Sequence, residues 1–117
     1  MKKILIVDDD AALAALLKAY LISAGLEVDT ACDGLDAMEK LGKEIPHLIV
    51  LDVIMPRLDG YGFLLEIKKD AKLRSIPVVV VSAREMMRDM FVQEGVKGFI
   101  TKPYDPAELH RAIEKFL

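Results

Sequence analysis

Residues Lys2–Asp10 read KKILIVDDD, a short aliphatic run that ends in three consecutive acids. Residues His47–Asp52 read HLIVLD, and this second run also ends in an acid. Aliphatic runs of this length without alternation are typical of strands that are buried on both faces of a parallel sheet. The acids would then lie at the carboxyl edge of the sheet, where open α/β sheets bind their ligands. If the two strands are neighbours, their carboxylates repel one another and need a cation, so we expect a hard divalent metal and phosphate chemistry there.

The composition indicates one globular domain with a single buried core. The chain has 117 residues, of which 53% are hydrophobic and 30% are charged, and its formal net charge is −3. This charge leaves no basic surface for nucleic acid, and the longest apolar runs are too short to cross a bilayer. The single cysteine, Cys32, fits a reducing compartment. We therefore expect a cytoplasmic protein that binds neither nucleic acid nor membranes.

Strand-like and helix-like segments alternate along the whole chain. The strands are expected at 2–7, 27–31, 47–52, 76–82 and 98–101, and helical patterns follow them at about 13–24, 33–42, 59–67, 84–94 and 105–116. Five strands alternating with five helices predict an α/β fold, (βα)5, with a doubly wound parallel five-stranded sheet between two helical layers. The common strand order of such a sheet is 2-1-3-4-5.

Acids also mark the starts of several helices. Asp10 is better explained as a helix cap than as a ligand of a metal, and Asp59 is placed to cap the helix that follows it. The segment Asp105-Pro106-Ala107-Glu108 combines a cap, a proline at the first helical position and the glutamate of a capping box. These signals fix the helix starts with more certainty than periodicity alone.

The expected strand order brings four strand ends together at one crevice. Asp8 and Asp9 follow the first strand and Asp52 ends the third. Ser82 ends the fourth strand, and Lys102 follows the fifth. Three acids, one hydroxyl and one ammonium would therefore converge where the strand order reverses.

Four motifs at these strand ends resemble one protein family. They are Val7-Asp8-Asp9, Leu51-Asp52-Val53-Ile54-Met55-Pro56 with Asp59-Gly60, Val81-Ser82-Ala83, and Phe99-Ile100-Thr101-Lys102-Pro103. In these motifs the chain is similar to the receiver domain of two-component response regulators, the family of the chemotaxis response regulator. The resemblance covers residues 1–117 and implies a flavodoxin-like fold, with one receiver domain and no output domain. It also implies a signalling phosphoprotein that catalyses only its own phosphorylation and dephosphorylation, and not an enzyme that acts on other substrates.

The resemblance assigns a role to each polar residue of the crevice. Asp52 would be the phosphoacceptor, taking a phosphoryl group from the phosphohistidine of a sensor histidine kinase or a histidine phosphotransfer protein. Asp9 and Asp52 would bind Mg²⁺ directly, Asp8 through water and Ile54 through its backbone carbonyl. Lys102 would pair with a phosphoryl oxygen. Three carboxylates against one divalent ion and one ammonium leave the site near neutrality, which suits an oxygen-lined Mg²⁺ site.

The resemblance also implies a conformational switch. Ser82 would donate a hydrogen bond to the phosphoryl group, and Phe99 would then turn from solvent into the space that the hydroxyl leaves. The response would be read by a downstream target at the helix 84–94, the strand 98–101 and the helix 105–116. We expect the chain to act as a monomer or a weak dimer.

Smaller features of the motifs carry further expectations. The Lys102–Pro103 peptide bond would be cis, which is affordable before proline. Ile54 and Arg84 would flank the path of the water that hydrolyses the acyl phosphate, and an apolar residue at 54 cannot orient that water, so we expect slow self-dephosphorylation. The segment between Ser82 and Lys102 is a couple of residues shorter than is usual in the family.

Two other functions compete with this interpretation. A small aspartyl-nucleophile phosphatase similar to the haloacid dehalogenase family would use the Asp-x-Asp within 8–10, but Ala12 stands where that family has Thr or Val. A degenerate receiver would act only as a docking module, which the complete set of acids, Ser82 and Lys102 argues against. Phosphoryl labelling separates the phosphatase from the active receiver, because the phosphoryl group would be carried by Asp8 in the phosphatase and by Asp52 in the receiver.

Overall fold

The structure is a computed structural model of the chain, and it describes residues 1–53 and 59–117. Five strands form one parallel sheet in the order β2-β1-β3-β4-β5. The strands are β1 (Lys3–Val7), β2 (Glu27–Ala31), β3 (Leu48–Asp52), β4 (Val78–Ser82) and β5 (Gly98–Thr101). The strand order confirms the doubly wound α/β fold that the sequence predicts.

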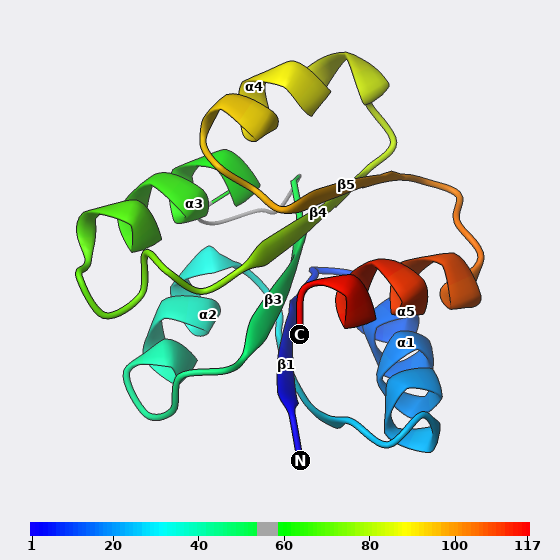
Figure 1. Ribbon diagram of the computed structural model, residues 1–117. Helices are drawn as coiled ribbons and strands as arrows, with labels where there is room; N and C mark the ends of the chain where they lie inside the picture. Colours follow the sequence, from blue (N-terminus) through cyan, green and yellow to red (C-terminus); the bar gives the residue numbers. More distant parts are fainter. Residues whose placement is uncertain (54–58) are drawn as a thin grey trace.

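Helices cover both faces of the sheet (Figure 1). One layer consists of α1 (Ala11–Ser23) and α5 (Pro106–Lys115), and the other of α2 (Gly34–Leu41), α3 (Gly60–Lys69) and α4 (Arg88–Gln93). A single 3-10 turn, η1 (Glu85–Met87), precedes α4. Within residues 1–53 and 59–117, none of the helices combines the length and hydropathy that crossing a membrane requires.

Acidic side chains start the helices as the sequence predicts. Asp10 accepts a hydrogen bond from the backbone N–H of Leu13 at the start of α1, at 3.1 Å. Asp59 and Asp105 cap α3 and α5 in the same way, and Pro106 is the first residue of α5. Each cap satisfies a backbone donor that would otherwise be unpaired.

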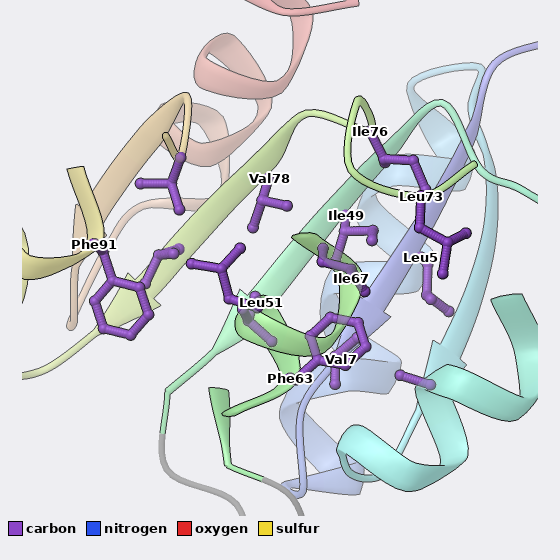
Figure 2. Close-up of a cluster of buried hydrophobic side chains, with 14 of the residues drawn as sticks. Leu5, Val7, Ile49, Leu51, Phe63, Ile67, Leu73, Ile76, Val78 and Phe91 are labelled. Atoms are coloured by element: carbon purple, nitrogen blue, oxygen red, sulfur yellow. The ribbon is translucent and has the colours of Figure 1, made fainter. Parts of the chain in front are cut away.

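The core lies in two layers because successive residues of a strand point to opposite faces of the sheet. In β1, Leu5 and Val7 pack in the cluster that contains Phe63 of α3 (Figure 2). Ile4 and Ile6 pack in the second cluster, against α1 and α5. Burial of these aliphatic side chains supplies most of the energy that holds the helices on the sheet.

Most element boundaries differ from the expected ones by one or two residues, and the largest differences concern β4 and α4. The strand expected from Ile76 begins at Val78, because Pro77 has no N–H to donate and the Ile76 N–H bonds back to Leu73 in a turn. The single helix expected at 84–94 is a 3-10 turn followed by a six-residue α-helix. Arg84 stands at the N-terminal end of the 3-10 turn and makes no side-chain cap hydrogen bond, because its guanidinium has no acceptor atom.

Gly60 allows α3 to begin directly against the end of β3. A Cβ atom at this position would lie 2.6 Å from the carbonyl oxygen of Asp52 and 2.6 Å from the Cα of Val53. The Gly60 N–H also donates to the Val53 carbonyl oxygen at 2.8 Å. The backbone that carries Asp52 and the first turn of α3 are therefore in contact, and only glycine leaves room for it.

We predict that Gly60→Ala destabilises the fold by about 1–3 kcal/mol, the usual cost of forcing an extra carbon into a packed site. Urea unfolding of both proteins measures the change. Gly98→Ala is the matched control, since a Cβ there meets side-chain atoms only at ordinary contact distances of 3.5 and 3.6 Å. Equal midpoints for Gly60→Ala and the wild type would show that the contact is not tight.

Candidate functional site

Three carboxylates gather at the carboxyl edge of the sheet. Asp8 and Asp9 follow β1, and Asp52 ends the neighbouring strand β3, where Val7 and Leu51 are paired in register. One carboxylate oxygen from each acid lies within 4.8 Å of the others. Oxygen atoms held this closely can surround one hard divalent cation. The structure thus brings together the three acids that the sequence predicts to meet.

Lys102 reaches this cluster from the far side of β4. Its backbone N–H donates to the Ser82 carbonyl oxygen at 2.8 Å, which fixes the residue beside the end of β4. Its Nζ atom lies 3.3 Å from Oδ1 of Asp52, which also accepts the Val53 N–H at 2.9 Å. The ammonium therefore points into the crevice and partly neutralises the buried Asp52. The Lys102–Pro103 peptide bond is cis, as expected.

Burial governs the charges of the cluster. It raises the pKa of Asp8 from 3.8 to about 6, opposed by a hydrogen bond from the Asp10 N–H and reinforced by the charge of Asp52. Burial also raises the pKa of Asp52, although the nearby Lys102 works against the shift. For Lys102, the carboxylates of Asp52 and Asp8 outweigh the effect of burial and raise its pKa. One ammonium does not balance these acids, so the site favours a further cation.

Ser82 occupies the end of β4, between the strands that carry Asp52 and Lys102. It directly follows Val81, the register partner of Asp52, and it is itself paired with Thr101. The side chain is buried, and its Oγ accepts the backbone N–H of Arg84 at 3.0 Å. The Arg84 side chain is exposed. Ile54, expected to contribute its carbonyl and to tune hydrolysis, lies outside the described residues.

Phe99 lies inside the protein, and its ring is not in solvent. The residue is 6% exposed, its ring centroid lies 6.3 Å from that of Phe91, and the Arg88 guanidinium is 4.9 Å from the ring centroid. The family resemblance implied that the Phe99 ring would be in solvent before phosphorylation. The difference arises because Phe91 and Arg88 of α4 cover this position, a contact that the spacing of the residues does not reveal.

An apolar cavity of about 410 Å³ opens beside the acid cluster. Its lining residues come from α1 and from the segments after β4 and β5: Leu13, Leu16, Leu17, Ala83, Lys102, Pro103, Tyr104 and Pro106. Leu13 and Leu16 are 47% and 69% exposed. Reasoning from the sequence missed this cavity. The available signal was that apolar residues occur on all sides of α1, although only one side of a surface helix packs on the core.

Comparisons with known proteins identify the family. The family described as the response regulator receiver domain matches residues 4–114. Response regulator Rre1 of Synechocystis sp. is 36% identical over an alignment of 117 positions, which covers 97% of this chain and 51% of that protein. The probable transcriptional regulator ycf27 of Cyanophora paradoxa is 38% identical over 118 residues, covering 99% of this chain and 48% of the relative. The chain spans about half the length of these curated relatives.

Solved structures show the same architecture. The chemotaxis response regulator CheY4 of Vibrio cholerae superposes with a TM-score of 0.93 at 28% identity, covering 100% of this chain and 99% of that one. Response regulator TrrA of Thermotoga maritima, solved in complex with Mg²⁺ and BeF, gives a TM-score of 0.89 at 31% identity and covers 100% of both chains.

The chain belongs to the response regulator receiver domain family. It is a phosphoacceptor signalling domain of the two-component type, and the phosphatase interpretation is not favoured. Receiver domains bind Mg²⁺ at an acidic pocket, and Asp8, Asp9 and Asp52 form an acidic cluster of this kind. Response regulators interact with sensor kinases and with downstream targets.

The raised pKa of Asp8 leads to a prediction about stability. Between about pH 4 and 6, Asp8 keeps its proton in the folded protein but has lost it in the unfolded chain. The free energy of unfolding therefore falls as the pH rises through this range, and the full loss is present above it. In metal-free buffer we expect Asp8→Asn to be more stable than the wild type by about 1 kcal/mol at pH 7, a value reduced for partial exposure, and equally stable at pH 4.

Urea unfolding at the two pH values, in the presence of a chelator, measures this difference. Asp10→Asn is the matched control, because Asp10 is exposed and asparagine is an equally good helix cap. A stabilisation of the same size at both pH values, or in the control, would contradict the assigned cause.

Proposed function

We propose that Asp52 is the phosphoacceptor of this chain and receives its phosphoryl group from a phosphohistidine of a sensor histidine kinase or a histidine phosphotransfer protein. A carboxylate oxygen of Asp52 attacks phosphorus, the bond from phosphorus to the imidazole nitrogen breaks, and the electron pair leaves with the imidazole. An acyl phosphate results. The observation that carries the proposal is the buried Asp52 carboxylate, held by Lys102 at 3.3 Å within a cluster of acids.

Asp8, Asp9 and Asp52 are proposed to hold Mg²⁺. Their oxygens form an all-oxygen donor set within 4.8 Å. Burial raises the pKa values of Asp8 and Asp52 by penalising their charged forms, and a divalent ion would stabilise the ionised carboxylates. When bound, Mg²⁺ supplies charge neutralisation for the transferring phosphoryl oxygens. The backbone carbonyl of Ile54 is proposed as a further ligand, and that residue lies outside the described part of the chain.

Lys102 and Ser82 are proposed to bind the transferred phosphoryl group. The Lys102 ammonium already points at the Asp52 carboxylate, so it lies near any group attached there. Ser82 follows the register partner of Asp52, and its Oγ, now an acceptor from Arg84, has a hydroxyl proton to donate. Both groups are positioned before the reaction, which is how a site lowers a barrier that depends on charge and alignment.

We further propose that residues 1–117 act as one receiver domain that signals in the cytoplasm to a protein target. The α4–β5–α5 face would carry the readout, and Ile54 with Arg84 would keep self-dephosphorylation slow. Exposed Met86, Met90 and Val92 on η1 and α4 support a protein partner at this face. With a net charge of −3, the domain itself has no electrostatic attraction for nucleic acid or anionic membranes. A monomer or weak dimer is proposed.

The expected result of phosphorylation with acetyl phosphate and Mg²⁺ is a single modified residue, Asp52, located by mass spectrometry after borohydride reduction. Asp52→Asn should lose the modification completely, because the amide oxygen cannot replace the carboxylate as nucleophile. Asp59→Asn is the matched control, since Asp59 caps α3 outside the cluster. A phosphoryl group found on Asp8 would overturn the proposal in favour of the phosphatase interpretation.

The apolar cavity beside Asp52 is proposed to receive the helix that carries the donor phosphohistidine. Lys102 belongs to both the cavity and the acid cluster, so an element seated in the cavity is brought next to Asp52. Leu13 and Leu16 of α1 are exposed there and offer an apolar surface to a helix of the donor. The phosphoryl donor must approach Asp52 from solvent, and this cavity adjoins the crevice.

Leu16→Asn should slow phosphotransfer from a protein donor about tenfold or more and leave phosphorylation by acetyl phosphate unchanged, because only the protein needs the docking surface. Rates are measured with the sensor kinase that phosphorylates the wild type best in a survey of the host's kinases. Leu35→Asn is the control, since Leu35 is 50% exposed on α2. Equal slowing with both donors would contradict the docking role.

A further inference from the structure

Three side chains connect the start of α4 to the edge strand β5. The Glu85 carboxylate accepts hydrogen bonds from Nε and Nη2 of Arg88, the latter at 3.1 Å. It also accepts a hydrogen bond from Oγ1 of Thr101 on β5, at 2.5 Å. One carboxylate therefore joins η1, α4 and β5.

The same network covers the ring of Phe99. The guanidinium that Glu85 orients lies 4.9 Å from the centroid of the Phe99 ring, close enough for a cation–π interaction. Phe91 of α4 contacts the ring as well, with 6.3 Å between centroids. Thr101 is two residues beyond Phe99 on the same strand, so its hydrogen bond fixes the β5 backbone beside the ring.

We propose that Glu85, Arg88 and Thr101 form a latch that keeps Phe99 inside the protein whether or not Asp52 is phosphorylated. None of the three latch contacts involves Asp52, Ser82 or Lys102. The inward position of Phe99 is therefore stabilised by contacts that the phosphoryl group neither makes nor breaks. Only the comparison with the phosphorylated form rests on the proposed role of Asp52.

The short α4 makes such a latch effective. The helix has six residues after one 3-10 turn, which is too short to hold a helical conformation by itself. Phe91 is its only buried residue, so few apolar contacts fix its position on the sheet. The low pKa of Glu85, caused first by Arg88 and then by Thr101, agrees with a carboxylate that is held in the ionised form by both partners.

The latch limits how far phosphorylation can change the position of the Phe99 ring. An exposed ion pair and an exposed cation–π contact each shift a two-state equilibrium by a few-fold, and together by about tenfold. A ligand shifts an equilibrium only through its different affinities for the two states. If the latch already favours the inward ring, phosphorylation has little further effect on Phe99.

The test is NMR of the Phe99 ring in protein that is isotopically labelled at phenylalanine. The Phe99 signal is assigned by its loss in the variant Phe99→Leu. In metal-free buffer we expect wild type to show contacts between the rings of Phe99 and Phe91, and Mg²⁺ with beryllofluoride to change them little. Glu85→Gln, Arg88→Met and Thr101→Val should each weaken the contacts, and the double variant Glu85→Gln/Arg88→Met should lose at least half of their intensity. In that double variant, beryllofluoride should restore them.

Glu66→Gln is the matched control, because it removes a surface ion pair with the same i,i+3 spacing, Glu66–Lys69, on α3. Thr101→Val keeps the β-branched shape and so tests the latch without endangering the fold. The proposal is overturned if the wild-type rings are in contact only with beryllofluoride, or if the latch variants match Glu66→Gln. The metal-free measurements stand even if Asp52 proves not to bind beryllofluoride, so the two proposals can fail separately.

Discussion

The attraction between the Lys102 ammonium and the Asp52 carboxylate, across β4, is the interaction on which the site depends. Asp8 and Asp9 lie in the same crevice as Asp52, and burial makes ionisation of Asp8 and Asp52 unfavourable. A single ammonium stabilises part of this charge, and the remainder favours a divalent cation at the proposed metal site. Such a cation would in turn offset the negative charge of an incoming phosphoryl group. The fold supplies the geometry, because parallel strands bring residues that are distant in sequence to one edge.

The surroundings of the cluster connect it to the rest of the molecule. Gly60 lets α3 begin against the backbone of Asp52, so the core under α3 supports the acid. Lys102 lies between the acid cluster and the apolar cavity beside α1, which connects the acids to the surface where we propose that the donor helix binds. The latch at Glu85 lies near the other end of this edge and holds β5 to α4.

Much of the fold could be predicted from local patterns. Aliphatic runs predicted β1, β3 and β4, and shorter mixed segments predicted β2 and β5. Asp10, Asp59 and Asp105 marked helix starts that the structure shows as caps. The strand order followed from the common doubly wound arrangement and from the family resemblance. The late start of β4 was not predicted because it depends on a turn in which the Ile76 N–H bonds to Leu73, and the 3-10 turn before α4 was not predicted because no residue pattern at 84–87 distinguishes it from an α-helix.

The sequence by itself determined which residue types stand at the strand ends, and therefore the chemistry that the site can perform. Strand periodicity and capping are local properties, set by neighbours along the chain. Only the tertiary structure decided that Phe99 lies beneath Arg88, that Leu13 and Leu16 stay exposed beside the acids, and that Lys102 reaches Asp52. These contacts join residues far apart in sequence, so they depend on how the layers pack and not on any local pattern.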